Sequence, residues 1–159
     1  MKLDSKDKAI LEILQRDATL SIQEIGDRVA LSANPCWRRI RHMEEAGIIE
    51  RRVAVVNPAA LGLAMTVFVS IRISAHDRGW LDRFAAAIRT IPEIVECHRM
   101  SGDVDYLLKM LVRDIRHYDR VYQRLISEVP GLSDVSSTFS MEQMKATPVP
   151  VNAIPAGGA

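Results

Sequence analysis

Apolar side chains in the first third of the chain recur every three or four positions, which is the period of an amphipathic helix. The pattern predicts three helices, over residues 3–16, 21–30 and 32–46. Asp4 and Ser21 are suitable N-cap residues, and Glu24 completes a capping box with Ser21. A very short connection at Leu31 and Ser32 joins the second and third helices. This arrangement is typical of a helix-turn-helix.

The third predicted helix has an apolar seam and a basic outer face. The seam residues are spaced i, i+4 and i+7 and therefore share one face: Cys36, Ile40 and Met43. Arg38, Arg41 and His42 fall off that face and point to solvent or to a polyanion. Gly47 is placed to end the helix. A helix of this kind suits DNA recognition, although many surface helices share the pattern.

The residues after Gly47 change from helical to strand character. The run IIERRVAVV is rich in β-branched residues and predicts a strand pair, or wing, which Asn57-Pro58 ends. A wing makes the N-terminal domain a winged helix-turn-helix, which we assign to residues 1–57. The short, small residues of 58–63 are assigned to a linker.

The second half of the chain alternates between strands and helices in the order βαββαβ. Strands are predicted at residues 64–74, 93–100, 105–112 and 134–141, and helices at 79–90 and 114–128. This order predicts a ferredoxin-like α+β domain over residues 64–147, with both helices on one face of an antiparallel sheet. The first helix is predicted to turn four residues inward: Leu81, Phe84, Ala85 and Ile88. The other sheet face is uncovered and apolar, so we expect at least a homodimer.

Composition supports a folded, two-part protein of 159 residues with an apolar fraction of 48%. Residues 148–159 are rich in Pro, Ala and Gly and are predicted to be a flexible tail. No apolar run approaches the roughly 20 residues that cross a bilayer, and the polar N-terminus does not resemble a secretory signal. We therefore expect a cytoplasmic protein without a membrane partner. Cys36 and Cys97 are predicted to be small core residues, although a thiol near a helix N-terminus also suits a redox sensor.

Charge is distributed unevenly although the net charge is only +1. The low net charge argues against a strongly basic protein that coats nucleic acid. Residues 32–52, however, contain five arginines and His42 against three glutamates. A local basic patch on a neutral chain suits a protein that contacts a few phosphates per subunit and gains affinity by forming oligomers.

Catalytic chemistry has no supporting pattern in the chain. The four histidines are placed in four different elements at no metal-ligand spacing: His42, His76, His98 and His117. A nucleophile elbow, a P-loop and a dinucleotide fingerprint are also absent from the sequence. We therefore expect no enzymatic activity, no cofactor and no metal site.

The third helix and the run after it supply the candidate contacts with double-stranded DNA. Six side chains of this helix are expected to face the major groove or its phosphate walls: Ala33, Asn34, Trp37, Arg38, Arg41 and His42. Arginine reads guanine and asparagine reads adenine through paired hydrogen bonds. Trp37 has two interpretations, because its ring suits either packing on the first helix or a sugar-phosphate edge. The predicted set also contains the wing residues Arg51 and Arg52, as phosphate contacts or as exposed partners of Glu50, and three polar residues: Ser21, Gln23 and Ser32.

The joint between the second and third predicted strands is a candidate effector site: Met100, Ser101, Gly102, Asp103 and Asp105. Glycine lets the backbone approach a ligand closely, and the free N–H groups of a tight turn can hold a carboxylate. A carboxylate of the turn can hold an ammonium group, so the chemistry suits an amino acid. Ser137 and Thr138 of the last strand are expected to complete the site. A plain β-turn is the alternative interpretation.

Five stretches resemble the Lrp/AsnC family of bacterial and archaeal transcription regulators: LDSKDKAILEILQRDA, SIQEIGDRVALS, PCWRRIRHMEEAGII, ECHRMSGDVDYLLKM and VPGLSDVSSTFSMEQMK. The resemblance covers roughly residues 3–147. ECH and SGDVDYLLK resemble the leucine-responsive regulators, while PCW, RMSGDVDYL and PGLSDVSSTFSMEQMK are also close to a branch that responds to cysteine. The resemblance implies an N-terminal domain that binds DNA, and dimers that assemble into tetramers or octamers. It also implies an effector site at residues 100–105, between dimers.

The resulting prediction is a sequence-specific DNA-binding transcription regulator. An amino acid such as leucine or cysteine, bound between C-terminal domains, is expected to change its DNA binding or its assembly. A second interpretation is an architectural protein that compacts DNA with little sequence preference and no effector. A third is a regulatory or enzymatic domain of amino-acid metabolism, against which the basic third helix argues.

Overall fold

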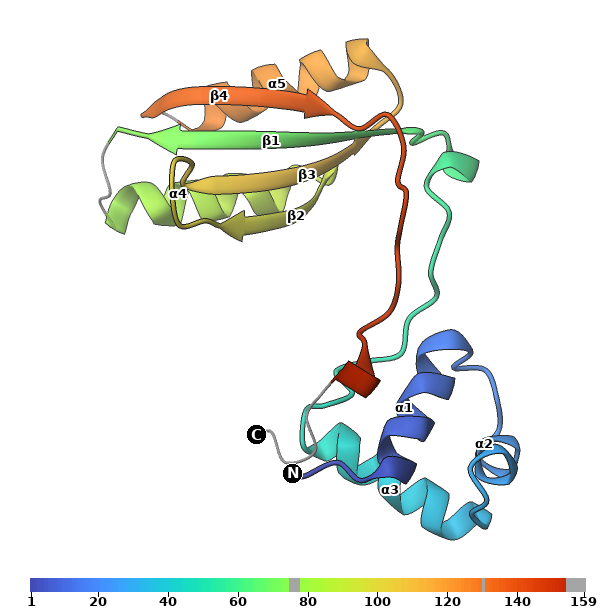
Figure 1. The fold of residues 1–159 in the computed structure, drawn as a ribbon. Coiled ribbons are helices and arrows are strands. Elements are labelled where there is room, and N and C mark those ends of the chain that lie inside the picture. Colours follow the sequence, from blue (N-terminus) through green and yellow to red (C-terminus); the bar gives the residue numbers. More distant parts are fainter. Residues whose placement is uncertain (75–77, 130, 154–159) are drawn as a thin grey trace. The chain divides into compact units, whose positions relative to one another are not determined.

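The computed structural model describes residues 1–74, 78–129 and 131–153. The chain forms two compact units (Figure 1). The first contains Met1–Val55 and the C-terminal segment that begins at Met144, and the second contains Val56–Gln143. His76, named above among the histidines, lies outside the described residues.

The first unit is built on three helices: α1 (Ser5–Arg16), α2 (Ile22–Arg28) and α3 (Ala33–Glu45). The N-caps predicted at Asp4 and Ser21 are confirmed, whereas Ser32, which the sequence also suggests as a cap, makes no side-chain capping bond. The Asp4 carboxylate accepts the Asp7 N–H at 2.9 Å, while the Asp7 carboxylate accepts the Asp4 N–H at 3.1 Å. Ser21 and Glu24 form the equivalent capping box at α2. These reciprocal bonds satisfy N–H groups that have no partner inside the helix.

The turn between α2 and α3 depends on close backbone contact at Gly26. A Cβ atom at this position would lie 2.6 Å from the Leu31 carbonyl oxygen, which no side chain can tolerate without movement of the backbone. The Gly26 carbonyl accepts the Leu31 N–H at 2.9 Å, and Ala30 has a left-handed φ of 53°. The short turn therefore brings the start of α3 directly against α2.

Helix α3 ends as the sequence predicts, at a Schellman motif. Gly47 has φ +70°, its N–H donates to the Glu44 carbonyl at 3.0 Å, and the Ile48 N–H donates to the Met43 carbonyl at 2.9 Å. The predicted strand pair of the wing is not formed among the described residues of this chain. Residues 50–56 are exposed and form no strand, because no other described segment of the chain pairs with them.

The C-terminal segment returns to α1. Val151, in the 3₁₀-helix Val151–Ala153, is 4% exposed and belongs to the same core cluster as Ile10 and Met43. The composition of residues 148–159 predicts a flexible tail, but residues 149–153 have defined contacts with α1 in this structure. The composition of a Pro-rich stretch does not show that one of its residues, Val151, packs into the apolar core of the first unit.

The second unit has the predicted βαββαβ order and the ferredoxin-like arrangement. Its strands form one antiparallel sheet in the order β2-β3-β1-β4. The central strands are therefore β3 and β1, and the edges are β2 and β4. The bounds of the elements are β1 (Met65–Ile73), α4 (Arg78–Thr90), β2 (Ile94–Arg99), β3 (Tyr106–Val112), α5 (Ile115–Glu128) and β4 (Leu132–Phe139).

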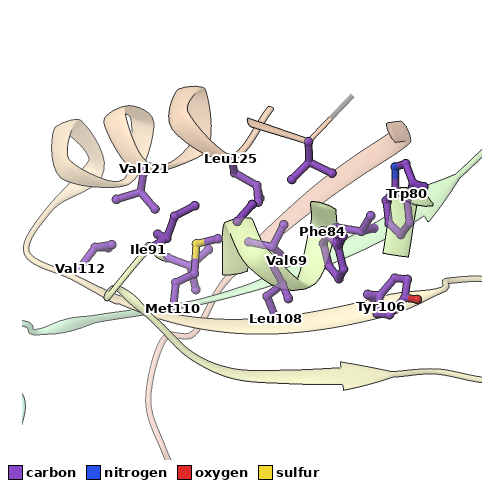
Figure 2. Packing of buried hydrophobic residues seen from close by; sticks show 14 residues of the cluster. Val69, Trp80, Phe84, Ile91, Tyr106, Leu108, Met110, Val112, Val121 and Leu125 are labelled. Carbon is purple, nitrogen blue, oxygen red and sulfur yellow. The ribbon is translucent and has the colours of Figure 1, made fainter. Parts of the chain in front are cut away.

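Every second residue of the central strands is buried against α4 and α5 (Figure 2). Trp80 is the aromatic anchor of α4, since it is 4% exposed and stacks on Phe84 with ring centroids 4.9 Å apart. Leu81 is 41% exposed, so the prediction that it faces the core is wrong. The larger ring of Trp80 fills the space beside Tyr106 instead, and the centroids of these two rings are 5.9 Å apart.

The opposite face of the sheet has no covering element among the described residues of this chain. Phe68 is 37% exposed there, and Leu107 and Leu111 are half-buried beside it. Lys109 donates to Glu96 across the same face at 2.8 Å. This face, defined by alternate residues of β1, β3 and β2, is called the open sheet face below.

Candidate DNA-binding surface and effector loop

The outer side of α3 exposes the predicted reading residues together. Trp37 is 52% exposed, which favours the interpretation of a surface ring over packing on α1. The exposed residues of this side also include Asn34, Arg38, Arg41 and His42. A shallow hollow of about 490 Å³ is lined by Trp37, Arg38, Arg41, His42 and Glu45. One helix therefore presents an aromatic ring, two guanidinium groups and an imidazole on one surface.

Arg39 belongs to the fold, although it lies between two predicted reading residues. Its Nη1 atom is 2.7 Å from the Asp4 carboxylate and 2.8 Å from the Asp7 carboxylate, and Asp7 is 3% exposed. The hydrogen bonds that Arg39 donates to the Asp7 and Asp4 carboxylates raise the pKa of Arg39. The Asp7 N–H and then the Arg39 guanidinium lower the pKa of Asp4. The arginine therefore fastens α3 to the first turn of α1.

Two of the predicted DNA-contacting arginines are paired with acidic residues of α3. Arg41 lies 3.3 Å from Glu44 and 3.6 Å from Glu45, and Arg52 lies 3.0 Å from the other oxygen of Glu44. Glu44 was not predicted to take part in the site, although its i, i+3 spacing from Arg41 is a recognisable signal. Arg38 and Arg51 have no ion pair within the described part of the chain, so their charges are available to a phosphate.

The polar residues at the starts of α2 and α3 differ in their availability. The Ser21 hydroxyl bonds the Glu24 carboxylate at 2.7 Å, and the Gln23 amide donates to Asp27 at 2.7 Å. Ser32 occupies the N-cap position of α3 without a side-chain capping bond, so its hydroxyl can bind a phosphate. Ala33 follows at the first position of α3 and is half-buried.

Cys36 is a core residue, as its spacing predicts. It is fully buried between α1, α2 and α3, and burial raises the pKa of its thiol, against a smaller lowering effect of Arg39. A raised pKa disfavours the reactive thiolate and argues against the redox interpretation. Cys97, by contrast, is exposed on the edge strand β2, so the prediction of a second core cysteine is wrong.

The loop between β2 and β3 is a closed turn with an exposed tip. Its ends are closed by a bond from the Met100 N–H to the Asp105 carbonyl at 2.8 Å, and Gly102 has φ +118°. The residues at its tip, Ser101 and Asp103 among them, are exposed. Within the described part of the chain, the N–H groups of residues 101–103 have no acceptor. They can therefore bind an anion.

Asp105 is tied into the sheet. Its carboxylate accepts the Ile73 N–H at 2.9 Å, and its own N–H donates to the Ile71 carbonyl at 2.9 Å. These bonds hold the loop against the end of β1. Asp103 is exposed and belongs to no hydrogen bond or ion pair within the described residues, so it is the freer carboxylate of the two.

Ser137 and Thr138 do not join the loop within one chain. They pair with Val69 and Phe68 in the middle of β1, two strands across from β3 and roughly 15 Å from the loop by strand geometry. Their side chains also take opposite faces, because the Ser137 hydroxyl bonds the Tyr118 hydroxyl at 2.5 Å on the helix side. A site that uses both the loop and β4 would need more than one chain.

The described residues contain no cluster of His, Cys, Asp and Glu that could hold a metal ion. No helix in the same part of the chain is long and apolar enough to cross a membrane. The structure therefore offers two candidate sites, the exposed side of α3 and the loop at residues 100–105.

Comparison with known proteins assigns a family model to each unit. Residues 3–50 match the winged helix-turn-helix DNA-binding model, and residues 66–150 match the Lrp/AsnC ligand binding domain. The chain is 49% identical over 144 residues to the glutamate uptake regulatory protein of Zymomonas mobilis. This match covers 91% of this chain and 87% of that protein. It is 43% identical over 145 residues to the DNA-binding transcriptional activator DecR of Escherichia coli, covering 91% and 95%.

A solved structure is similar over almost the entire chain. It is the complex of a Neisseria meningitidis transcriptional regulator with L-methionine, at 32% identity and a TM-score of 0.89. The match covers 95% of this chain and 98% of that one.

Proposed function

The chain belongs to the Lrp/AsnC family of transcription regulators, and from this we propose that α3 reads an operator while the loop at residues 100–105 receives an amino-acid effector. The protein is a DNA-binding transcription regulator with a ligand-binding domain, and its family is not one of enzymes. The residues that perform each step, the effector and the assembly are the content of the proposal. We place its action with the DNA in the cytoplasm.

The exposed side of α3 supports the operator-reading part of the proposal. Arg38 has no ion-pair partner among the described residues, and Asn34 lies one turn before it, so each can reach a base edge in the major groove. Arg51 and Ser32 flank the helix and are suited to phosphate contacts. Candidate base-reading groups on α3, with candidate phosphate-binding groups on either side of it, favour sequence-specific binding over compaction of DNA without sequence preference.

Binding to two duplexes tests this part. The first duplex carries the DNA upstream of the protein's own gene, and the second has the same length and a random sequence. A specific regulator is expected to bind the first at least a thousand-fold more tightly at physiological salt. Equal affinities, both falling steeply with salt, would instead identify an architectural protein.

The loop at residues 100–105 supports the effector part of the proposal. Its free N–H groups suit the carboxylate of an amino acid, and Asp103 suits the ammonium group. Met100 and Val104 supply apolar contacts beside them. The methionine complex of the similar Neisseria regulator makes an apolar amino acid a reasonable candidate. Because Ser137 and Thr138 lie far from the loop in one chain, they would take part only from another subunit.

The open sheet face supports assembly into a homodimer. Phe68, Leu107 and Leu111 give this face an apolar centre that a second copy would bury. Tetramers or octamers would then bring loops of neighbouring dimers together. Effector binding between them would change how recognition helices are spaced, which couples two distant binding sites.

Calorimetry with L-methionine, L-leucine, L-cysteine and L-glutamate tests the effector site. Asp103→Asn is expected to weaken binding of the active amino acid about ten-fold or more, because a hydrogen bond to a charged group contributes about 1.5–3 kcal/mol. Asp105→Asn retains an oxygen that accepts the Ile73 N–H, so it separates charge from support of the loop. Asp119→Asn on α5 is the control. Unchanged affinity in both loop variants would remove the ligand from this loop.

A further inference from the structure

A groove in the first unit is occupied at one end by the chain's own C-terminal segment. The groove has a volume of about 340 Å³, and its walls come from α1 and from residues 48–55. Its lining is mostly apolar, and Leu11, Leu14 and Ile49 form much of it. Val149 and Val151 border the same space. The groove and its occupant therefore lie within one compact unit.

The contacts of residues 149–153 involve both the main chain and the side chains of this segment. The Gln15 side chain binds both main-chain groups of Val149, donating to its carbonyl at 3.2 Å and accepting its N–H at 2.8 Å. The Asn152 amide donates to the Glu12 carboxylate. Val151 is 4% exposed in the core of the unit, while Val149 is 68% exposed. One buried side chain thus provides the anchor, two hydrogen bonds hold the main chain of Val149, and a third holds the side chain of Asn152.

Docking of residues 149–153 ties the second unit to the first at a second point of the chain. β4 ends at Phe139, and residues 140–148 join it to the docked segment, so the second unit is linked to the first at both of its ends. The N-terminal link is the exposed stretch that follows Val55. A nine-residue link cannot exceed about 30 Å even when fully extended. A segment held this close has a high effective concentration at its groove, so even weak contacts keep it bound.

The docked segment is held by few contacts of its own. Residues 140–148 form no helix or strand, and residues 141–150 are all exposed. Ordering five residues costs conformational entropy at every position, against the burial of one valine and three hydrogen bonds. Such a contact is easily opened and closed. A change in the unit to which it is attached can then shift its occupancy.

We propose that residues 149–153 form a detachable strap whose receptor is the α1 groove, and that its release transmits the state of the ligand-binding unit to the DNA-binding unit. Two strap residues, Val149 and Val151, line the same groove as Arg51 and Arg52, which are proposed phosphate contacts. Release frees the segment that carries these arginines and so lowers DNA affinity without changing the reading side of α3. The docking step stands on the contacts above, while the transmission step rests on the proposed function.

Hydrogen exchange tests the docking step without DNA or effector. Val151→Asp places a charge in the apolar site, and Val149→Asp is its matched control, because the Val149 side chain is exposed and only its backbone is used. Amides of residues 149–153 are expected to exchange at least ten-fold faster in Val151→Asp than in the wild type or the control. Equal exchange in the wild type and Val151→Asp would overturn the strap.

A second variant keeps the test valid if Val151→Asp unfolds the first unit. Gln15→Ala combined with Asn152→Ala removes the three hydrogen bonds and leaves the core untouched. It is expected to speed the same exchange several-fold. A synthetic peptide of residues 145–153, added to the full chain at millimolar concentration, is expected to compete for the groove and produce the same faster exchange. Absence of both effects would contradict the proposal.

Two further readouts separate the strap from the proposed function. Crosslinking of a Glu12→Cys/Asn152→Cys variant is expected to join residues of one chain, and a link only between chains would assign the groove to a neighbouring copy. With the active amino acid, Val149→Asp is expected to retain the effector-dependent change in DNA affinity, whereas Val151→Asp loses it but still binds the amino acid. A full response in Val151→Asp would overturn transmission. If no amino acid alters the wild type, the effector proposal fails and the exchange result still decides docking.

Discussion

The exposed side of α3 and the loop at residues 100–105 differ in how much of a binding site one chain contains. Helix α3 carries aromatic, cationic and amide groups on a rigid element that begins after Ser32 and is closed at its C-terminal end by Gly47. The loop offers free N–H groups and Asp103, but its proposed partners Ser137 and Thr138 are distant. A site on one helix is organised by local structure, whereas a site at a turn between copies depends on assembly.

The largest expected effect concerns the arginine of α3 that does not read DNA. Arg39→Ala is expected to destabilise the first unit by about 2–4 kcal/mol, because it leaves the buried Asp7 carboxylate without its cation. The lower part of the usual range applies, since the Arg39 side chain is 34% exposed. Chemical denaturation measures the change.

Arg39→Met/Asp7→Leu provides the comparison for that variant. Removing both charges avoids an unpaired buried carboxylate, so the double variant is expected to recover most of the lost stability. If Arg39→Ala alone unfolds at the wild-type denaturant concentration and instead weakens DNA binding, Arg39 belongs to the reading surface and the division of α3 proposed here is wrong.

The next largest effect compares two arginines of the same surface, Arg38, which has no ion pair among the described residues, and Arg41, which has two. Arg38→Ala is expected to weaken operator binding by about 1–3 kcal/mol if it reads a base. Arg41→Ala is expected to cost less, because Arg41 must first leave Glu44 and Glu45. Fluorescence anisotropy with operator and random duplexes measures both, and Arg89→Ala on α4 is the control. Equal losses on both duplexes would reassign Arg38 to phosphate binding.

Replacement of Glu44 is expected to change DNA affinity less, and to raise it. Glu44→Gln frees Arg41 and Arg52, so DNA affinity should rise by about 0.2–1 kcal/mol, mostly on random DNA. The salt dependence should steepen because two more charges are available to phosphates. Asp82→Asn, at an exposed position of α4, is the matched substitution. Weaker binding in Glu44→Gln would mean that Glu44 positions the arginines for DNA and does not compete with it.

The smallest expected effect is a loss of folding stability at acid pH, and it concerns both units. The N–H of Asp7 lowers the pKa of Asp4, and the N–H of His117 lowers the pKa of Asp114, below the ordinary value of 3.8. A lowered carboxylate pKa adds stability that is complete above the ordinary value and disappears as the pH falls through the folded value. Stability of both units should therefore decline together below about pH 4.

Asp4→Asn and Asp114→Asn test that acid response. Each is expected to remove part of the pH dependence from its own unit while leaving the other unit unchanged. Thermal unfolding between pH 3 and pH 6 measures this. An acid transition confined to one unit in the wild type would show that the helix caps do not determine it.

The sequence predicts those features that depend on neighbouring residues. The N-cap Asp4, the capping box of Ser21 and Glu24, the end of α3 at Gly47 and the strand order βαββαβ all arise from short-range patterns, and the structure confirms them. The separation of α3 into an apolar seam and an exposed side also follows from helical spacing. These features need only the period of the helix or strand and the chemistry of its ends.

Features that depend on distant partners were not predictable in the same way. Spacing cannot show that Arg39 meets acids more than thirty residues earlier, or that Trp80 takes the inward position in place of Leu81. The sequence also places Val151 in a stretch whose composition indicates a free tail. The wing needs a pairing partner, and the described residues of this chain provide none for residues 50–56.

The return of the C-terminal segment to α1 has a practical consequence for protein engineering. Topologically, the ligand-binding unit is an insertion within the DNA-binding unit, since the latter is assembled from both ends of the chain. A chimaera that exchanges DNA-binding domains by a single cut in the linker would separate the α1 groove from its matching peptide. Interchangeable parts would need two junctions, one near Val55 and one near Met144.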